Sequence, residues 1–191
     1  MVHLSALQEF VGFFVVGGWL GYTAYWLEWY RKPLWVYAVL IAKIFAGWAF
    51  AAIYFHYYKV GDGLTLYLRA RAYGYFLWHE PHVGLSLLGE LPCLDWDTTS
   101  WKPAWRDIEG YVWERLVFLL YLAAGGSYYG MHGLMGLVSG LLLYGAYRKW
   151  ERLLSLPWYF AVVWFLWPSS LFWLSGLLRD SLVLPGMLYV A

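Results

Sequence analysis

The stretch LWVYAVLIAKIFAGWAFAAIYFHYY, residues 34–58, decides the fold of this chain. Lys43 is its one formally charged side chain, and the stretch exceeds the roughly 20 apolar residues that cross a bilayer core. Aromatic residues such as Trp35 and Tyr58 stand near its two ends. Flat rings with one polar edge favour the headgroup region. The stretch therefore predicts a membrane-spanning helix.

The composition of the whole chain also indicates a membrane protein. Of its 191 residues, 62% are hydrophobic and 13% are charged, whereas soluble domains are about half apolar and a quarter charged. A soluble fold of this size cannot bury so much apolar surface, so lipid must cover part of it. The net charge of +1 gives no electrostatic basis for binding nucleic acid. Cys93 is the single cysteine, which excludes an intrachain disulfide.

Three further runs have the length and apolarity of a membrane span. They are residues 9–27, 128–147 and 158–178. The expected fold class is therefore all-α, a polytopic helical membrane protein with four transmembrane helices in a single membrane domain. The last apolar stretch, residues 181–191, is too short to cross. Either this stretch is a short terminal helix, or the sequence is the N-terminal part of a longer protein, and we expect the second.

Charge placement predicts the orientation of these spans. The short basic connections at residues 31–32 and 148–152 should face the cytoplasm. The long segment 59–126 then forms an outer loop, with amphipathic interfacial helices at residues 63–76 and 83–88. Residues 113–124 either cross or lie at the interface. We expect the second, because crossing would place the two basic connections on opposite sides of the membrane.

Asp62 is the first candidate for chemistry, because it lies between Gly61 and Gly63 directly after the second span. The glycines allow a tight turn at the membrane surface, where partial desolvation would strengthen the carboxylate as a base. The alternative is a turn aspartate that caps the following helix. Arg179 and Asp180 end the fourth run on the same predicted side. Arg179 could hold a phosphate through its planar guanidinium, or the pair could simply end the span.

Three other polar sites have weaker patterns. In HEPH, residues 79–82, Pro81 disfavours a helix that would place both histidines on one face, so we expect a solvated loop and no metal site. Lys43 either faces a partner or a polar cavity inside the membrane, or extends to the cytoplasmic surface. Glu114 and Arg115 stand at the start of a short apolar helix, where adjacent opposite charges indicate the water boundary.

A family resemblance rests on three of these stretches. They are Gly61-Asp62-Gly63, Glu114-Arg115, and PSSLFWLSGLLRD at residues 168–180. Together they resemble the front half of a group of uncharacterised bacterial multi-pass inner-membrane proteins. Those proteins are similar to the GT-C glycosyltransferases, which use polyprenyl-phosphate-linked sugars. The resemblance covers residues 57–181 and implies a location in the bacterial inner membrane.

The resemblance implies an enzyme that transfers a sugar from a polyprenyl-phosphate donor at the outer face of the membrane. Asp62 would match the family's outer-loop acid, which serves as a base or contacts a divalent metal ion. Arg179 would match a cation near the lipid phosphate. In such an enzyme Arg69 or Arg71 would help Arg179 to stabilise the charge of the departing phosphate, and Asp180 would complete the substrate site. The expected partners are the bilayer and the lipid-linked sugar, with no nucleic acid.

The alternative function is a non-enzymatic helical subunit or scaffold of a larger membrane complex. Small residues at three- and four-residue spacing allow close helix contacts. Such a series begins just before the run at residues 128–147 and continues through it, at Gly126, Gly130, Gly133, Gly136 and Gly140. Lys43 could add a polar contact to a membrane protein partner. A transporter is a weaker interpretation, because four spans with few intramembrane charges make a poor substrate path.

Overall fold

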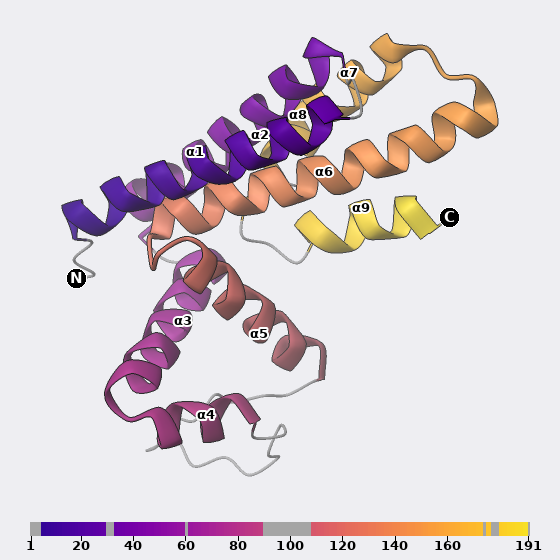
Figure 1. Ribbon diagram of the computed structural model, residues 1–191. Coiled ribbons are helices and arrows are strands. Elements are labelled where there is room, and N and C mark those ends of the chain that lie inside the picture. Colours follow the sequence, from indigo (N-terminus) through magenta and orange to yellow (C-terminus); the bar gives the residue numbers. More distant parts are fainter. Residues whose placement is uncertain are drawn as a thin grey trace.

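The computed structural model describes residues 5–29, 33–59, 61–89, 108–173, 175–176 and 180–190. Every regular element in these ranges is helical (Figure 1), which confirms the predicted all-α class. In chain order the elements are α1 (Ala6–Trp29), α2 (Leu34–Ala52), the π-helical segment η1 (Ile53–Tyr58), α3 (Asp62–His79), α4 (Pro81–Gly89), α5 (Ile108–Ala123), α6 (Tyr128–Leu154), α7 (Trp158–Leu166), α8 (Pro168–Trp173) and α9 (Asp180–Val190).

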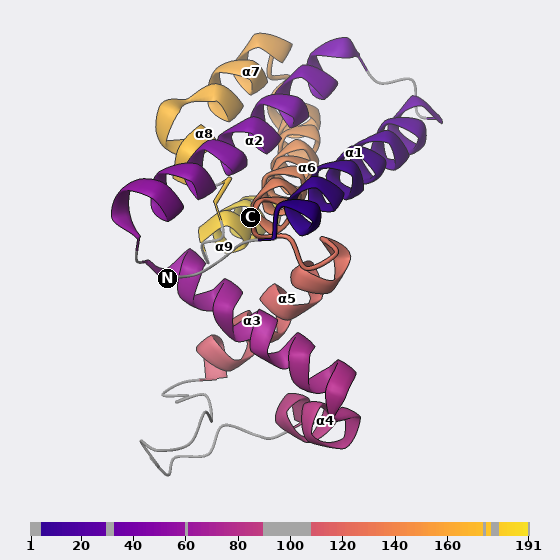
Figure 2. The ribbon, with the colours of Figure 1, turned by 90° about the vertical axis from the view of Figure 1, so that its left-hand side faces the viewer.

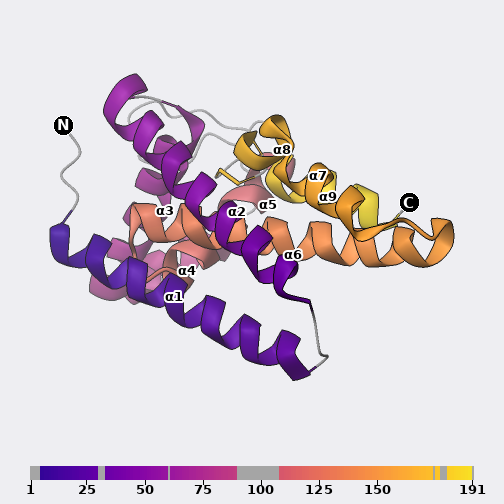
Figure 3. The same cartoon turned by 90° about the horizontal axis from the view of Figure 1, so that it is seen from above.

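Helices α1, α2 and α6 form the main bundle, and α2 crosses over α6 when the molecule is seen from above (Figure 3). Glycines allow the close approach at this crossing. A Cβ atom on Gly136 would meet the carbonyl oxygen of Lys43, and one on Gly47 would meet the carbonyl oxygen of His132. The expected packing role of the glycine series is therefore confirmed at Gly136.

Two elements are long and apolar enough to cross a membrane, judged by length and composition among the described residues. They are α1 over residues 6–27 and the continuous α2–η1 helix over residues 34–58. Large apolar side chains on α1 point outward, including Phe14 (67% exposed) and Tyr25 (68% exposed). These helices correspond to the first and second expected spans.

The fourth apolar run is not the continuous helix expected at residues 158–178. It breaks at Trp167, whose backbone is extended (φ −54°, ψ 131°), into the short helices α7 and α8. Pro168 explains the break, because proline lacks a backbone N–H and disfavours a helical conformation in the preceding residue. The short apolar stretch that follows forms α9, which packs against α6.

Helices α3, α4 and α5 lie beyond one end of the bundle (Figures 1 and 2). The expected amphipathic helices at 63–76 and 83–88 correspond to α3 and α4, with slightly wider bounds. α5 begins earlier than the short helix expected at 113–124. It joins α6 through Gly125 (φ 62°) and Gly126 (φ 79°), a left-handed turn that glycine adopts without strain.

Candidate functional site

Asp62 begins α3 with an exposed side chain, at the end of the apolar α2–η1 helix. The turn that positions it passes through Gly61, whose φ of 141° is unfavourable for other residues. A Cβ at Gly61 would also lie 2.7 Å from the Tyr54 ring. Gly61 itself is the N-cap residue, so Asp62 does not cap α3 as the alternative interpretation required. A first-turn carboxylate still interacts favourably with the helix dipole.

Arg69 lies two turns after Asp62 on the same face of α3, about 10 Å further along the helix. Its guanidinium forms an ion pair with Glu114 of α5. The hydroxyl of Tyr73 donates to the second oxygen of Glu114 at 3.4 Å, and Arg115 donates to that hydroxyl at 3.3 Å. These four residues make a polar network between α3 and α5. The Arg69 side chain remains 43% exposed, whereas that of Glu114 is 4% exposed.

The burial of Glu114 corrects the expectation that this residue marks the water boundary. Burial raises the pKa of the Glu114 carboxyl above its usual value, and the nearby Arg69 partly opposes this effect. Burial, together with the Glu114 charge, raises the pKa of Tyr73 to about 12. The network therefore holds a buried carboxyl group in an apolar interface, where the hydrogen-bonded Arg69 offsets part of the cost of burial.

Arg71 lies on the opposite face of α3 from Asp62, because nine residues along the helix are two and a half turns. Its positive charge lies near the hydroxyl of Tyr67, whose ring is fully buried against α5 and α6. The structure therefore places Arg69, and not Arg71, on the face that Asp62 occupies.

The described residues show no contact between Asp62 and the predicted pair Arg179–Asp180. Arg179 lies outside those residues, and Asp180 is described only as the first residue of α9. The next residue, Ser181, donates to the carbonyl oxygen of Gly176 at 2.6 Å, and Gly176 packs against the ring of Phe50. Phe50 lies about 12 Å from the end of η1 along the helix axis. The start of α9 is therefore at the depth of Phe50, below the level of Asp62.

The HEPH sequence forms a helix junction in place of the expected loop. His79 ends α3, where its ring stacks on Tyr75 with centroids 4.2 Å apart, and Pro81 begins α4. Proline suits a first helical position, because the N–H it lacks would have no partner there. Among the described residues, no group of three or more His, Cys, Asp or Glu side chains could bind a metal ion.

Lys43 is fully buried between α2, α6 and α8. Its Nζ atom donates to the carbonyl oxygen of Ser170 at 2.5 Å. Lys43 therefore makes an interior contact and does not extend to the cytoplasmic surface, which was the alternative expectation. Because α8 ends at Trp173, the last carbonyls of α8 need partners from outside the helix, and Lys43 supplies one.

Glu9 is a buried polar residue that the sequence did not single out as functional. Its carboxylate accepts hydrogen bonds from the Ser127 hydroxyl and from the backbone N–H groups of Tyr128 and Tyr129. These groups lie at the N-terminus of α6, so the hydrogen bonds of Glu9 connect α1 to that end of α6. An acid inside an otherwise apolar run was the available signal, but its partners lie far away in the sequence.

Comparison with known proteins gives no relative from which to transfer a function. No protein-family model matches the chain, and no curated protein or solved structure matches it.

Proposed function

We propose that this chain belongs to a multi-pass protein of the bacterial inner membrane that transfers a sugar from a polyprenyl-phosphate donor at the outer face. One observation carries the proposal: the exposed Asp62 carboxylate stands where an apolar helix long enough to cross a membrane ends. A carboxylate at that level would lie beside the headgroup of a lipid-linked donor. It would accept the proton of the acceptor hydroxyl as the sugar moves to that oxygen.

Arg69 is the proposed contact to the donor phosphate. It shares the face of Asp62, and its guanidinium is partly exposed although it is paired with Glu114. A guanidinium has five N–H donors, so one ion pair leaves others available for phosphate oxygens. Arg179 and Asp180 remain proposed donor contacts, and a divalent ion bound by Asp62 remains a proposed cofactor. The position of Arg71 on the opposite face of α3, near the buried Tyr67, favours a structural role for Arg71.

We also propose that α6 and the α7–α8 pair cross the membrane together with α1 and α2. α6 packs along α2, so a bilayer that surrounds α2 also surrounds α6. α7 and α8 both pack on α2 as well. A broken helix is tolerated at membrane depth when its free backbone groups find partners, and the bond from Lys43 to Ser170 supplies such a partner.

The enzymatic proposal is tested by transfer assays on the whole protein in nanodiscs, with polyprenyl phosphates carrying different hexoses as donors. Asp62→Asn should reduce transfer by at least about 100-fold, the usual loss when a general base is removed. Glu80→Gln is the matched control, because Glu80 is an exposed carboxylate at the opposite end of α3; its transfer rate should be unchanged. Equal turnover by the Asp62→Asn variant would remove Asp62 from the mechanism. If the wild type neither transfers sugar nor gains thermal stability from polyprenyl phosphate, the proposed function is wrong.

A scaffold function is favoured by a different observation on α1. Gly17, Gly18 and Gly21 meet open space, whereas glycines at the α2–α6 crossing are covered by a neighbouring helix. Gly17 and Gly21 have the four-residue spacing that allows two membrane helices to approach closely. Native mass measurement in detergent distinguishes the two functions. A stoichiometric protein partner that Gly21→Leu releases would support the scaffold, and a monomer unaffected by that change would exclude it.

A further inference from the structure

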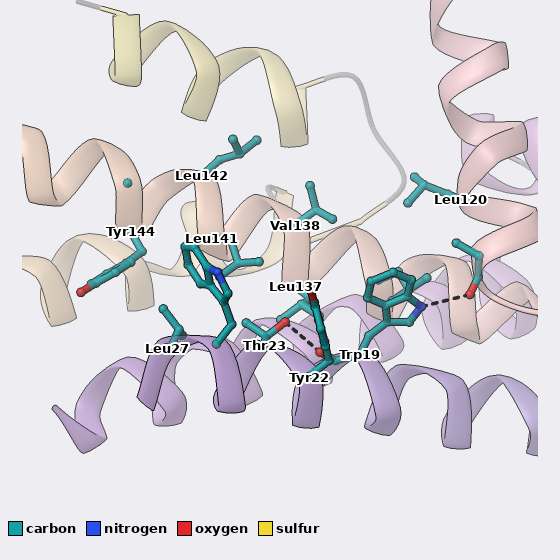
Figure 4. A pocket seen from close by; sticks show the side chains of 14 residues that line it. Trp19, Tyr22, Thr23, Leu27, Leu120, Leu137, Val138, Leu141, Leu142 and Tyr144 are labelled. Carbon is teal, nitrogen blue, oxygen red and sulfur yellow. Dashed lines mark hydrogen bonds between the residues drawn. The ribbon is translucent and has the colours of Figure 1, made fainter. Parts of the chain in front are cut away.

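An apolar groove of about 740 Å³ lies between α1 and α6, next to the end of α5 (Figure 4). Its walls include Trp19 and Trp26 from α1, and Leu134, Leu141 and other aliphatic residues from α6. Two polar groups in the wall bond to backbone nearby: the Trp19 indole donates to the Ala123 carbonyl, and Thr23 donates to the Trp19 carbonyl. The groove therefore offers mainly hydrocarbon contact to a ligand.

The α6 side of the groove is about as long as one leaflet of a bilayer. Its lining on α6 extends from Leu134 to Gly145, which is about 16 Å at the rise of an α-helix. Half of a typical hydrocarbon core is about 15 Å. An extended hydrocarbon chain of that length that enters near Gly145 would reach Leu134, next to which Leu120 and Ala123 of α5 also line the groove.

Basic residues follow the groove at the C-terminal end of α6. Arg148 and Arg152 follow Leu141 and Gly145 on the same face of α6, by the angular spacing of 100° per residue. Arg148 donates to Glu151 at 2.7 Å and stays partly exposed. Arg152 is exposed and forms no ion pair with any of the described residues. By the charge rule used above, this end of α6 faces the cytoplasm.

The geometry points to a binding site for one anionic phospholipid of the cytoplasmic leaflet. An acyl chain occupies the α1–α6 groove, and the lipid phosphate contacts Arg152 and Arg148. Charge complementarity selects an anionic headgroup, and the apolar lining of the groove accepts an acyl chain. A polyprenyl donor would instead approach from the opposite end, where Asp62 lies. The phospholipid site is thus independent of the proposed transferase activity.

Native mass spectrometry of the whole protein tests this site, after release from nanodiscs that contain phosphatidylglycerol, phosphatidylcholine or an equal mixture. The wild type should retain one phosphatidylglycerol in preference to phosphatidylcholine. Arg152→Gln should lower the retention of phosphatidylglycerol about fivefold, the effect of one basic residue at an anionic surface. Lys149→Gln is the matched charge control, because Lys149 is directed to the Val190 carbonyl on α9; its retention should equal that of the wild type.

A second pair of variants tests the groove itself. Val138→Trp fills the groove and should abolish retention of both lipids, whereas Ile41→Trp, on an exposed face of α2, should leave retention unchanged. Circular dichroism confirms that each variant is folded. Unchanged retention in folded Val138→Trp, or equal effects of Arg152→Gln and Lys149→Gln, would overturn the proposal. Displacement of phosphatidylglycerol by an equimolar polyprenyl phosphate would also overturn it, because the groove would then belong to the donor lipid.

Discussion

The Glu9 carboxylate and the Ser127 hydroxyl, 118 positions apart in the sequence, are joined by a hydrogen bond of 2.6 Å. The same Ser127 oxygen accepts the backbone N–H of Gly130 at 2.7 Å and so caps α6. Glu9 therefore acts as a second cap, contributed by another helix. The negative carboxylate meets the positive end of the helix dipole where unpaired N–H groups would otherwise be buried.

Loss of this second cap should destabilise the protein strongly. Glu9→Ala leaves three donors, two of them in fully buried hydrogen bonds, without their acceptor, and we expect a loss of about 2–3 kcal/mol in the free energy of unfolding in detergent. Because the residues share one hydrogen bond, Glu9→Ala and Ser127→Ala should show a coupling of about 1 kcal/mol in a double-mutant cycle. Glu80→Ala, at an exposed carboxylate, serves as the control. Fully additive effects of the two changes would contradict the shared cap.

Removal of the Lys43 amine should loosen α8 specifically. Lys43→Met keeps a long apolar side chain but leaves the Ser170 carbonyl without its donor. Hydrogen exchange followed by mass spectrometry should show about tenfold faster exchange in peptides that cover α8, with α6 unchanged. Lys59→Met, at an exposed lysine, removes the same charge without touching α8. Equal exchange of α8 in both variants would show that the Lys43 contact does not hold this helix.

The α2–α6 crossing should be intolerant of a single added methyl group. Gly136→Ala places a Cβ against the backbone of Lys43, and the helices must separate to accept it. We expect a loss of about 1–3 kcal/mol, typical of overpacking. Gly17→Ala adds the same group in open space and should stabilise α1 by up to about 1 kcal/mol, because alanine favours the helix. Thermal unfolding of both variants in one detergent measures the contrast, and similar midpoints would contradict it.

The free energy of unfolding should depend on pH because Glu114 is buried. Its raised pKa means that, above the usual value of 4.5, the folded state binds more protons at this site than the unfolded state. The free energy of unfolding should therefore fall as the pH rises from 4.5 through the raised pKa. Glu114→Gln removes this contribution, so its unfolding midpoint should depend less on pH than that of the wild type. Parallel curves for the two proteins would contradict the assignment.

Local features of the chain were predictable from the sequence. The α2–η1 helix follows from an unbroken apolar run, and the turn before Asp62 follows from its two flanking glycines. The break at Trp167 also had a local cause in Pro168, although run length alone favoured a single helix. Apolar length shows that a helix fits a bilayer, but it does not show whether the helix is continuous.

Long-range polar contacts were not predictable from the sequence. Arg69 meets Glu114 across 45 positions, and Glu9 meets Ser127 across 118. These pairs depend on how α3 packs on α5 and how α1 packs on α6, for which no local pattern exists. A charged residue near the start of an apolar run suggests contact with water, yet the tertiary structure buries both glutamates and gives them partners.

The central claim is that α2 carries Asp62 to the outer face of a membrane while the basic end of α6 stays in the cytoplasm. Cysteine labelling tests it directly, since Cys93→Ser removes the single native thiol. In that background, Asp62→Cys should react with a membrane-impermeant maleimide in intact cells. Leu153→Cys, at an exposed position near the end of α6, should react only after the cells are permeabilised. Labelling of both positions from the same side of the membrane would contradict the account.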